Sequence, residues 1–299
     1  MKYTAKAPLR VDLASSWTCL PAIAEKMGGH AVCAAIGIYA EGSIALPLGD
    51  SFLMSLRSER RYVSYSLDLP IGAGLGASAA QTVLWVALLR SVIDNAADRR
   101  EVARISCQLN SMMGTLMGQQ DAYASAIGGV SFVSVSSNVE AERLELATSV
   151  LHELAGRMVV LWSGQAGRSL EVARALQSEF EKGRRDVVNG LAELKSGASG
   201  VRHALNDGRI DDVAALADEQ WLRQQEILPD SAPPRVREVA ELARRHGAIG
   251  VKECGIAGGA LVAFSRLGDR EHLVTAMQAS KVRVLDAGVD TFGVHLRKA

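Results

Sequence analysis

The pattern of hydrophobic and polar positions predicts strands at the start of the chain and a buried helix after them. Pro8–Leu13 and Ala31–Ala40 have the pattern of strands, and residues 51–66 carry alternating segments. Gln81–Ile93 is apolar almost all round, which is typical of a helix inside the core. The first half is therefore expected to consist of short extended segments around one buried helix.

The second half continues with a mixture of helices and strands. The expected helices are Arg100–Met113, Ala122–Ile127, an array from Ser169 to about Leu228, Arg235–His246 and Arg270–Ser280. The expected strands are Val130–Val135, Met158–Trp162, Ala248–Lys252, Gly259–Phe264, Val282–Leu285 and Phe292–Leu296. Helix runs and strand runs segregate rather than alternate, so we expect an α+β fold. The change of pattern near Gly156 predicts two domains, residues 1–155 and 156–299.

The composition is that of a globular protein without net charge. The 299 residues suffice for two domains, and 48% of them are apolar while 22% are charged. Because 33 basic residues balance 33 acidic residues, the chain has no overall field that would hold nucleic acid or an anionic membrane. We therefore expect neither of these partners, and the composition leaves the oligomeric state open.

Cysteine and histidine spacing argues against a transition-metal enzyme. The 4 cysteines are far apart without a C-x-x-C pair, and the 6 histidines are scattered, so a reduced cytoplasm is the expected compartment. The N-terminal residues lack the apolar stretch of a signal peptide, and no apolar run is long enough to span a bilayer. These features predict a cytoplasmic protein.

A glycine-rich segment before the buried helix is the strongest chemical signal. Gly72, Gly74 and Gly76 occupy alternate positions, and the helix is expected to begin near Ser78. Residues without a Cβ let the backbone turn tightly and point its N–H groups at one spot, where the helix start also favours an anion. The segment is a candidate polyphosphate cradle, with a glycine hinge for close helix packing as the alternative. Neither the Walker A nor the G-x-G-x-x-G pattern is present.

The glycine-rich segment is one of several motifs along the chain: Ala7–Ala14 with Trp17-Thr18, Pro70–Ala80, Gly118–Tyr123, Ser163–Ser169 and Gly247–Gly259. In this order they resemble the signatures of the GHMP kinases, the superfamily of galactokinase, homoserine kinase, mevalonate kinase and phosphomevalonate kinase. The pattern is most similar to that of L-fucokinase and D-glycero-D-manno-heptose 7-phosphate kinase. The motifs extend along nearly the whole chain.

This resemblance implies a two-domain fold and a kinase activity. The fold would have an N-terminal domain like ribosomal protein S5 and a C-terminal ferredoxin-like α/β sandwich with added helices. The activity would be transfer of a phosphoryl group from ATP, with Mg²⁺, to a sugar or sugar phosphate, the anomeric hydroxyl being favoured. The residues expected to bind ATP are Pro70, Gly72, Ala73, Gly74, Leu75, Gly76, Ala77, Ser78 and Ala79, and those expected to bind Mg²⁺ are Ser78 and Asn110.

Asp121 and Arg10 are the catalytic residues that the resemblance assigns. Asp121 would position or deprotonate the acceptor hydroxyl, and Arg10 would keep that carboxylate ionised. From the residues alone, Asp121 is better explained as an N-cap at a helix start, and a strand-end ion pair is the structural alternative for Arg10. The expected substrate-binding residues are Asp12, Trp17, Cys19, Gln120, Arg168 and Gly258.

Three residues of the matched segments have ordinary structural alternatives. Trp17 alone is more often a core residue, although an aromatic face beside a carboxylate suits a sugar ring. Arg168 alone is more often a solvated surface residue. Lys252, in the third signature, is as readily structural as functional.

Departures from the family pattern leave the activity and the acceptor open. Cys19 stands where an aspartate that binds sugar hydroxyls is usual, and Asn110 stands where a Mg²⁺-binding glutamate is usual. Ile256 and Ala257 add bulk within the third glycine segment. The alternatives are a catalytically weakened homologue that binds nucleotide or sugar as a regulator, and a kinase for a non-sugar alcohol. The short stretch from Ile44 to Asp68 leaves the preference for a nucleotide base open.

Overall fold

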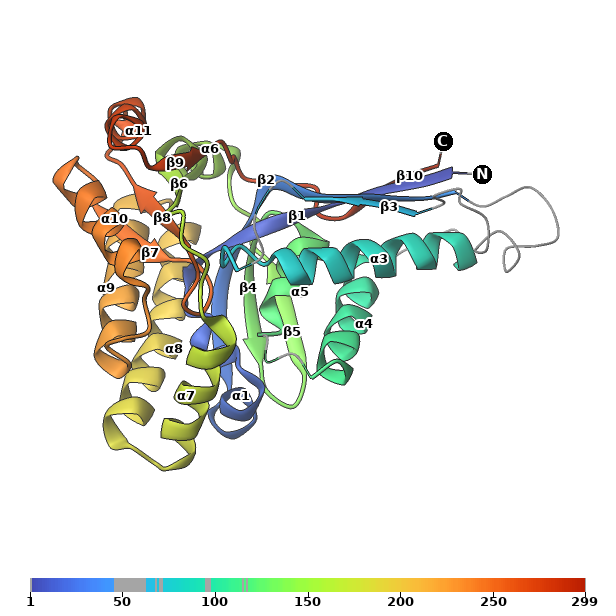
Figure 1. Cartoon of the computed structure of the whole chain (residues 1–299), viewed down its shortest axis with the longest axis horizontal. Coiled ribbons are helices and arrows are strands. Elements are labelled where there is room, and N and C mark those ends of the chain that lie inside the picture. The colour runs from blue at the N-terminus through green and yellow to red at the C-terminus, as the bar shows by residue number, and fades with distance from the viewer. Residues whose placement is uncertain are drawn as a thin grey trace.

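The protein is built from two antiparallel sheets with helices packed against them, as the computed structural model in Figure 1 shows. The structure describes residues 2–45, 63–67, 69, 72–94, 98–114, 116 and 118–298. The strands are β1 (Lys2–Ala14), β2 (Gly29–Ala45), β3 (Val63–Ser66), β4 (Val130–Val135), β5 (Val139–Arg143), β6 (Met158–Trp162), β7 (Gly250–Glu253), β8 (Ala260–Phe264), β9 (Arg283–Leu285) and β10 (His295–Lys298). The helices are η1 (Trp17–Cys19), α1 (Pro21–Met27), α3 (Ala77–Asp94), α4 (Arg99–Met112), α5 (Gln120–Ile127), α6 (Thr148–Arg157), α7 (Ser169–Glu181), α8 (Arg185–Asn206), α9 (Ile210–Ile227), α10 (Pro234–Arg245) and α11 (Arg270–Ala279). The expected α+β class is confirmed.

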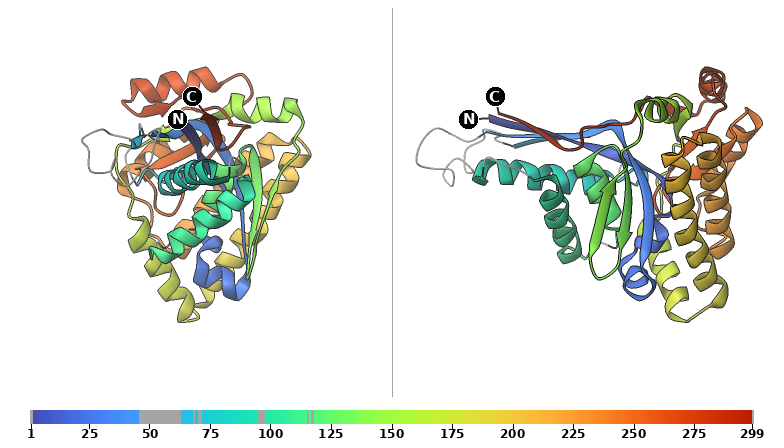
Figure 2. Two further views of the ribbon diagram at one scale, coloured as in Figure 1. Left: turned by 90° about the vertical axis from the view of Figure 1, so that its right-hand side faces the viewer. Right: turned by 180° about the vertical axis from the view of Figure 1, so that it is seen from behind.

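The first sheet is formed around two long strands, β1 and β2. Its order is β10-β1-β2-β4-β5, with β3 also paired to β2, and all pairings are antiparallel. Helices α3 and α5 pack against β1 and β2, and α8 and α9 from the second half of the chain also lie along β1 (Figure 2). Residues 8–14 of β1 are therefore all buried, which explains why the sequence shows little alternation there. Strand β10 brings the C-terminal end back beside the N-terminal end.

The second sheet has the strand order of a ferredoxin-like sandwich. Its order is β7-β8-β6-β9, which is 2-3-1-4 when the strands are counted along the chain, and every pairing is antiparallel. Helices α10 and α11 pack against it and share a buried cluster with it. The C-terminal fold expected from the family resemblance is thus confirmed. The division of the chain at residue 155 stays a prediction.

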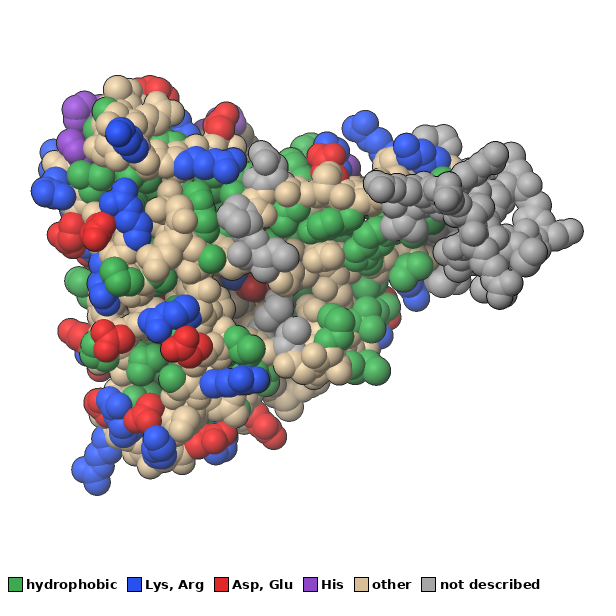
Figure 3. Space-filling model, in the orientation of Figure 1, with side chains coloured by type: hydrophobic (Ala, Val, Ile, Leu, Met, Phe, Trp, Pro, Cys, Tyr) green, Lys and Arg blue, Asp and Glu red, His purple; other side chains and the backbone are tan. Residues whose placement is uncertain are grey.

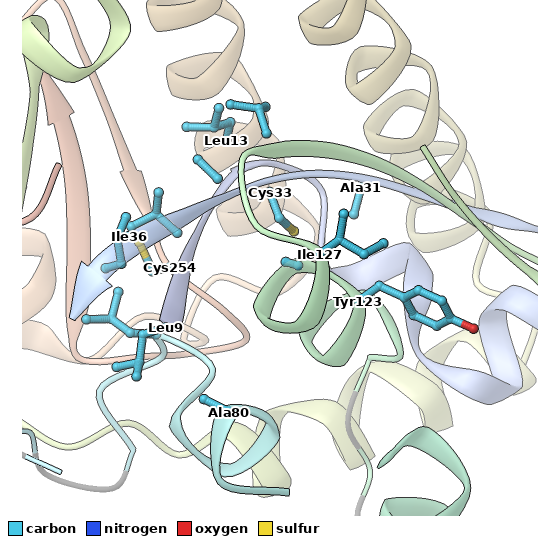
Figure 4. Close-up of a cluster of buried hydrophobic side chains, with 14 of the residues drawn as sticks. Leu9, Leu13, Ala31, Cys33, Ile36, Ala80, Tyr123, Ile127 and Cys254 are labelled. Carbon is cyan, nitrogen blue, oxygen red and sulfur yellow. The ribbon is translucent and has the colours of Figure 1, made fainter. Parts of the chain in front are cut away.

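One hydrophobic core joins elements that are far apart in the sequence (Figure 4). Leu9 and Leu13 on β1, Ile36 on β2 and Ala80 on α3 are completely buried in it. Cys254, which follows β7, belongs to the same core. Packing of strand, helix and loop residues into one core fixes the glycine-rich segment before α3 relative to β1 and to the segment after β7.

Differences from the sequence-based elements have local causes. The expected strand Phe292–Leu296 begins only at His295, because the Asp290 carboxylate accepts the N–H groups of Phe292 at 2.9 Å and Gly293 at 2.6 Å and holds a turn there. The sequence pattern did not predict α1, β5 or α6, whose 7, 5 and 10 residues give little periodicity. The expectation for residues 51–62 lies outside the described residues.

Most charged side chains on the face drawn in Figure 3 lie over the helices of the second half, whereas α3 and α4 present mainly uncharged side chains. Acidic and basic groups are mixed on these outer helices, as in the ion pairs Arg184–Glu179 and Arg235–Glu238. Within the part of the chain that the structure describes, no helix has the length and apolar character needed to cross a membrane.

Strand β7 places two charged residues in the protein interior. The exposed fractions of Lys252 and Glu253 are 0% and 1%, and Lys252 Nζ donates to the backbone carbonyl of Glu253 at 2.9 Å. The Oε1 atom of Glu253 has no hydrogen-bond partner among the described residues. Burial raises the pKa of Glu253 to about 8, and the positive charges of Lys252 and Arg237 only partly oppose this effect. The burial and backbone contact of Lys252 favour its structural alternative. Glu253 is largely protonated at neutral pH.

Replacing Glu253 with Gln should make stability less dependent on pH. Because the pKa of Glu253 is about 8 in the folded protein and near 4.5 when exposed, its contribution favours the fold at low pH and is lost as the pH rises through 8. This loss amounts to at most about 1.4 kcal/mol per pH unit between the two pKa values. The free energy of unfolding, measured with urea, should therefore fall less between pH 6 and pH 8 in Glu253→Gln than in the wild type, by up to about 1.4 kcal/mol for each pH unit. Equal decreases in the two proteins would contradict the assignment.

Candidate active site

The glycine-rich segment forms one wall of a cavity of about 130 Å³ at the start of α3. Gly72, Gly74 and Gly76 have φ values of +91°, +83° and +74°, in the left-handed region. Ala73 and Leu75 between them are buried, so the side chains point into the core and the glycine backbone faces the cavity. This geometry suits an anion cradle. Ala77 and Ser78 line the same cavity, whereas Pro70 lies outside the described residues.

The segment of residues 254–260 crosses the glycine-rich segment at short range. The carbonyl oxygen of Ala73 accepts the N–H groups of Gly259 at 3.1 Å and Ala260 at 2.8 Å. A Cβ at Gly74 would lie 2.1 Å from the carbonyl oxygen of Cys254 and 2.7 Å from the Cα of Gly258. The structure is therefore consistent with both interpretations, the polyphosphate cradle and the glycine hinge. The glycines permit close packing, and their backbone also faces the cavity.

Replacing Gly74 with Ala should destabilise the protein and weaken nucleotide binding. The left-handed backbone costs a Cβ residue about 1 kcal/mol, and overlap with a neighbouring backbone adds about 1–3 kcal/mol. Gly164 provides the matched control, because its φ is +84° and a Cβ there would meet nothing within 4 Å. Urea unfolding should show a larger loss for Gly74→Ala than for Gly164→Ala. Equal losses would mean that the crossing segments adjust freely.

Arg10 and Asp121 form a buried ion pair at the cavity. Arg10 Nε donates to Asp121 Oδ1 and Arg10 Nη2 donates to Asp121 Oδ2, both at 2.9 Å. Arg10 Nη1 donates to the carbonyl oxygen of Gly74. Gly76 leaves room for the arginine, since a Cβ there would lie 3.2 Å from Arg10 Cγ. The two-pronged contact fixes the orientation of the carboxylate relative to the glycine wall.

The surroundings of Asp121 make it a stronger base than an exposed aspartate. Burial raises the pKa of Asp121, the charge of Arg10 opposes this shift, and the negative charge of Asp12 adds to it. Asp121 lies in the first turn of α5, but it does not cap that helix, whose N-cap residue is Gln119. Gln120 Nε2 donates to Asp121 Oδ1 at 3.0 Å, while Gln120 Oε1 has no partner among the described residues. Gln120 also lines the cavity.

The residues expected to bind the substrate are not all at the cavity. Trp17 and Cys19 are completely buried and do not line it, and Trp17 belongs to a cluster shared with α7 and α8. Asp12 is also completely buried, and its Oδ2 accepts the N–H of Gly255 at 2.7 Å. Burial raises the pKa of Cys19, so its thiol stays neutral. Direct substrate contact by these three side chains stays a prediction.

Arg168 and Gly258 lie beside the cavity rather than in its lining. The Arg168 side chain is 47% exposed and pairs with Glu171 at 3.1 Å, and its Nη2 donates to the Asp230 carbonyl at 2.8 Å. A Cβ at Gly258 would lie 2.6 Å from the Cα of Gly74, so this glycine is required by packing. The exposure of the Arg168 side chain agrees with the alternative interpretation of Arg168 as a solvated surface residue.

The cavity lining also includes residues that the sequence analysis did not assign to ATP, Mg²⁺ or substrate. These residues are Ser16, Leu116, Gly118, Ser169, Gly255 and Ile256. Ser16 precedes Trp17 in the first signature and Ser169 follows Arg168, so their positions within matched segments were an available signal. Ile256 brings a bulky side chain to the cavity, as its place in the third glycine segment indicated. Ala257 adopts φ +48° and is completely buried.

The expected Mg²⁺ ligands supply oxygen atoms but no negative charge. Ser78 lines the cavity. Asn110 is 7% exposed, and Thr82 Oγ1 lies 3.0 Å from both the Asn110 Oδ1 atom and the carbonyl oxygen of Ser78. Asn110 and Ala79 line a second cavity, of about 670 Å³, that adjoins the first at Gly118. Hydroxyl and amide oxygens fit a hard cation, with nucleotide phosphates as the charged ligands. The described residues contain no cluster of three or more His, Cys, Asp or Glu side chains that could hold a metal.

The arrangement agrees with sequence comparisons. Residues 31–129 match the family model of the GHMP kinases N terminal domain, and residues 201–283 match that of the GHMP kinases C terminal. The chain belongs to the GHMP kinase family. The glycine-rich segment and Asp121 lie within the first match, and the third glycine segment lies within the second.

Known proteins similar to this GHMP kinase include two curated sugar kinases. The bifunctional fucokinase/GDP-fucose pyrophosphorylase of Arabidopsis thaliana is 24% identical over 196 residues, which are 64% of this chain but only 18% of that protein. The D-glycero-alpha-D-manno-heptose 7-phosphate kinase of Campylobacter jejuni is 22% identical over 246 residues, 79% of this chain and 71% of that protein. The structure of phosphomevalonate kinase from Streptococcus pneumoniae superposes with a TM-score of 0.76 at 14% identity, covering 97% of this chain and 99% of that one. This superposition confirms the two-domain fold.

Proposed function

We propose that the protein transfers the γ-phosphoryl group of ATP to a hydroxyl of a sugar or sugar phosphate, with the anomeric hydroxyl favoured. The observation that carries the proposal is the Arg10–Asp121 pair, which is buried at a cavity walled by the glycine-rich segment. Phosphoryl transfer needs a cradle for the phosphates and a group that positions the attacking hydroxyl, and the cavity brings both together. Family membership supports the reaction type.

Asp121 would act on the acceptor hydroxyl. Its carboxylate takes the hydroxyl proton as the acceptor oxygen forms a bond to the γ-phosphorus, and the bond from that phosphorus to the bridging oxygen of ADP breaks. A pKa raised by burial strengthens this base, and the bidentate contact from Arg10 holds it in one orientation. Arg10 also places a positive charge beside the phosphates, which offsets the charge that develops during transfer.

The glycine-rich segment and the start of α3 would hold the triphosphate. Backbone N–H groups next to Gly72, Gly74 and Gly76 supply donors without side-chain bulk, and the start of α3 adds a partial positive charge. Ser78 and Asn110 would contribute oxygen ligands to Mg²⁺. Bound Mg²⁺ supplies charge neutralisation on the phosphates and aligns them for transfer.

Polar groups in the cavity support a hydroxyl-rich acceptor. Gln120 Oε1 is buried without a partner among the described residues, so it is available to accept a hydrogen bond from an acceptor hydroxyl. Ser16 lines the same space. The names of the two sugar kinases similar to this chain also favour a sugar. A cytoplasmic location, a small-molecule partner and the absence of a nucleic-acid or membrane partner belong to the same proposal.

A product-based screen tests this function. The purified protein is incubated with ATP and Mg²⁺ and with a panel of aldoses, heptose phosphates, polyols and amino alcohols, and products are identified by mass spectrometry. The expected result is one phosphorylated sugar or sugar phosphate together with ADP. A phosphorylated amino alcohol would instead support the non-sugar acceptor, which the neutral Cys19 thiol favours because it lacks a carboxylate to bind sugar hydroxyls.

A second candidate function is that of a weakened homologue that binds nucleotide as a regulator. The observation that favours it is Asn110, whose amide oxygen already contacts Thr82 and carries no charge for Mg²⁺. Calorimetry with ATP separates the candidates. A regulator should bind ATP equally well with and without Mg²⁺ and form no product, whereas a kinase should turn over only with Mg²⁺.

A further inference from the structure

The Arg10 guanidinium is shared between two buried carboxylates. Arg10 and Asp12 are two residues apart on β1, so their side chains project from the same face of the strand. Arg10 Nε lies 2.9 Å from Asp121 Oδ1 and 3.3 Å from Asp12 Oδ1. The exposed fractions of the Arg10, Asp12 and Asp121 side chains are 4%, 0% and 10%. One positive charge therefore balances two potential negative charges in a region with little water.

The second oxygen of Asp12 holds Gly255, another residue of the cavity wall. Asp12 Oδ2 accepts the N–H of Gly255 at 2.7 Å, and Ser16 Oγ donates to the carbonyl oxygen of Gly255 at 3.1 Å. Gly255 lines the cavity and follows β7 of the second sheet, with φ +76°. A Cβ at Gly255 would lie 2.9 Å from the Gly74 carbonyl oxygen, so its position also fixes the glycine-rich segment. Asp12 thus connects the first sheet to the third glycine segment.

We propose that Asp12 is a positioning residue for phosphoryl transfer. It sets the basicity of the Asp121 carboxylate by sharing Arg10 with it, and it holds Gly255 in the cavity wall by accepting the Gly255 N–H. The proposal rests on the phosphotransfer function given above. Asp12 acts through Arg10 and Gly255 and does not line the cavity itself. A carboxylate at this position does two things that no neutral residue does together, since it competes for Arg10 and accepts the Gly255 N–H.

Among the described residues, the other ionisable groups whose charges interact with this trio are thiols. They come from four different elements or their ends: Cys19 from η1, Cys33 from β2, Cys107 from α4 and Cys254 after β7. Burial raises the pKa of each thiol, so all four stay neutral at physiological pH. Cys33 Sγ donates to Asp12 Oδ1 at 3.3 Å. Changes in the charge balance around Asp121 therefore come from Asp12 and Arg10.

The experiment replaces Asp12 with Asn and follows the titration of Asp121. An amide oxygen can still accept the Gly255 N–H, but the negative charge is lost and Arg10 then serves Asp121 alone. We expect the pKa of Asp121, followed by carbon NMR of labelled aspartate carboxyl groups, to fall by roughly 1 unit or more. The acid limb of the kcat/KM pH profile should move to lower pH by the same amount, with a larger effect on kcat than on KM.

Asp290→Asn is the matched control. Asp290 is likewise a buried aspartate, 5% exposed, that accepts two backbone N–H groups, but it lies outside the cavity lining. This variant should change neither the pKa of Asp121 nor the pH of the acid limb of the kcat/KM profile, even if it lowers stability. If Asp12→Asn does not fold, Asp12→Ser provides a second neutral acceptor, and the same downward shift is expected.

Two readouts separate failure of this proposal from failure of the proposed function. An unchanged Asp121 titration in a folded Asp12→Asn or Asp12→Ser protein overturns the role of Asp12, whether or not the protein turns over. A wild type without phosphorylated product overturns the proposed function, and the carboxyl titration still decides the role of Asp12. If Asp12→Asn and Asp12→Ser both lose stability but the Asp121 titration does not shift, Asp12 only holds Gly255. That result also overturns the proposal.

Discussion

Asp121→Asn is expected to lower the turnover number of phosphoryl transfer by about 10²–10⁴-fold, the range typical of a general base. The amide cannot take the hydroxyl proton, but its oxygen still accepts a hydrogen bond from Arg10, so the cavity wall should keep its shape. The affinity for ATP should change little, because Asp121 lines the same cavity but is not part of the glycine-rich segment that would hold the phosphates. Steady-state turnover and calorimetric titration with ATP measure the two effects separately.

Asp290→Asn again serves as the control for replacing a buried aspartate. It should retain the turnover of the wild type, since the Asp290 carboxylate accepts hydrogen bonds from Tyr39, Phe292 and Gly293 and does not line the cavity. Undiminished phosphorylation by a folded Asp121→Asn protein would remove Asp121 from its assigned role. A parallel loss of ATP affinity would show that Asp121 shapes the nucleotide cradle instead.

Arg10→Met is expected to have the largest effect on stability. Methionine has a similar length but leaves two buried carboxylates without their cation, and breaking a buried ion pair from one side costs about 3–5 kcal/mol. Arg10 also holds the Gly74 carbonyl and packs against Gly76, so the same change should disturb the glycine wall and abolish turnover. Urea unfolding at one fixed pH measures the stability.

A double-mutant cycle and a surface control sharpen this test. Asp121→Asn in the Arg10→Met background should cost less than the sum of the single changes, since it removes one of the unpaired charges. Arg184→Met should change stability little, because Arg184 is 42% exposed and its partners Glu179 and Asp186 are solvated. Simple additivity of the Arg10 and Asp121 variants would mean that the two side chains do not interact energetically.

Local sequence patterns predicted the elements that position the site. The all-round apolar pattern of Gln81–Ile93 lies within α3, and the glycines before it do adopt left-handed conformations. Glycine spacing reports on backbone shape, which depends only on neighbouring residues, so the cradle could be inferred from the sequence. The Arg10–Asp121 contact required the family resemblance, because nothing in the local pattern joins residues 111 positions apart.

Local sequence patterns could not predict which of the expected substrate-binding side chains face the cavity, for a physical reason. Asp12 and Trp17 sit in a matched segment, yet whether a side chain faces a cavity or the core depends on the packing of α7, α8 and the segment after β7. Gly258 likewise meets Gly74 only because two distant segments cross. Local patterns alone do not bring Ser16 and Ile256 into the same cavity wall, since the two residues belong to different halves of the chain.

The most direct test of the central claim is transfer of labelled phosphate from γ-labelled ATP to an acceptor, compared between the wild type and Asp121→Asn under single-turnover conditions. The wild type should move the label to a sugar or sugar phosphate in the presence of Mg²⁺, and Asp121→Asn should bind ATP but leave the label on the nucleotide. Equal transfer by both proteins, or ATP binding without transfer to any acceptor in the panel by the wild type, would contradict an Asp121-dependent kinase.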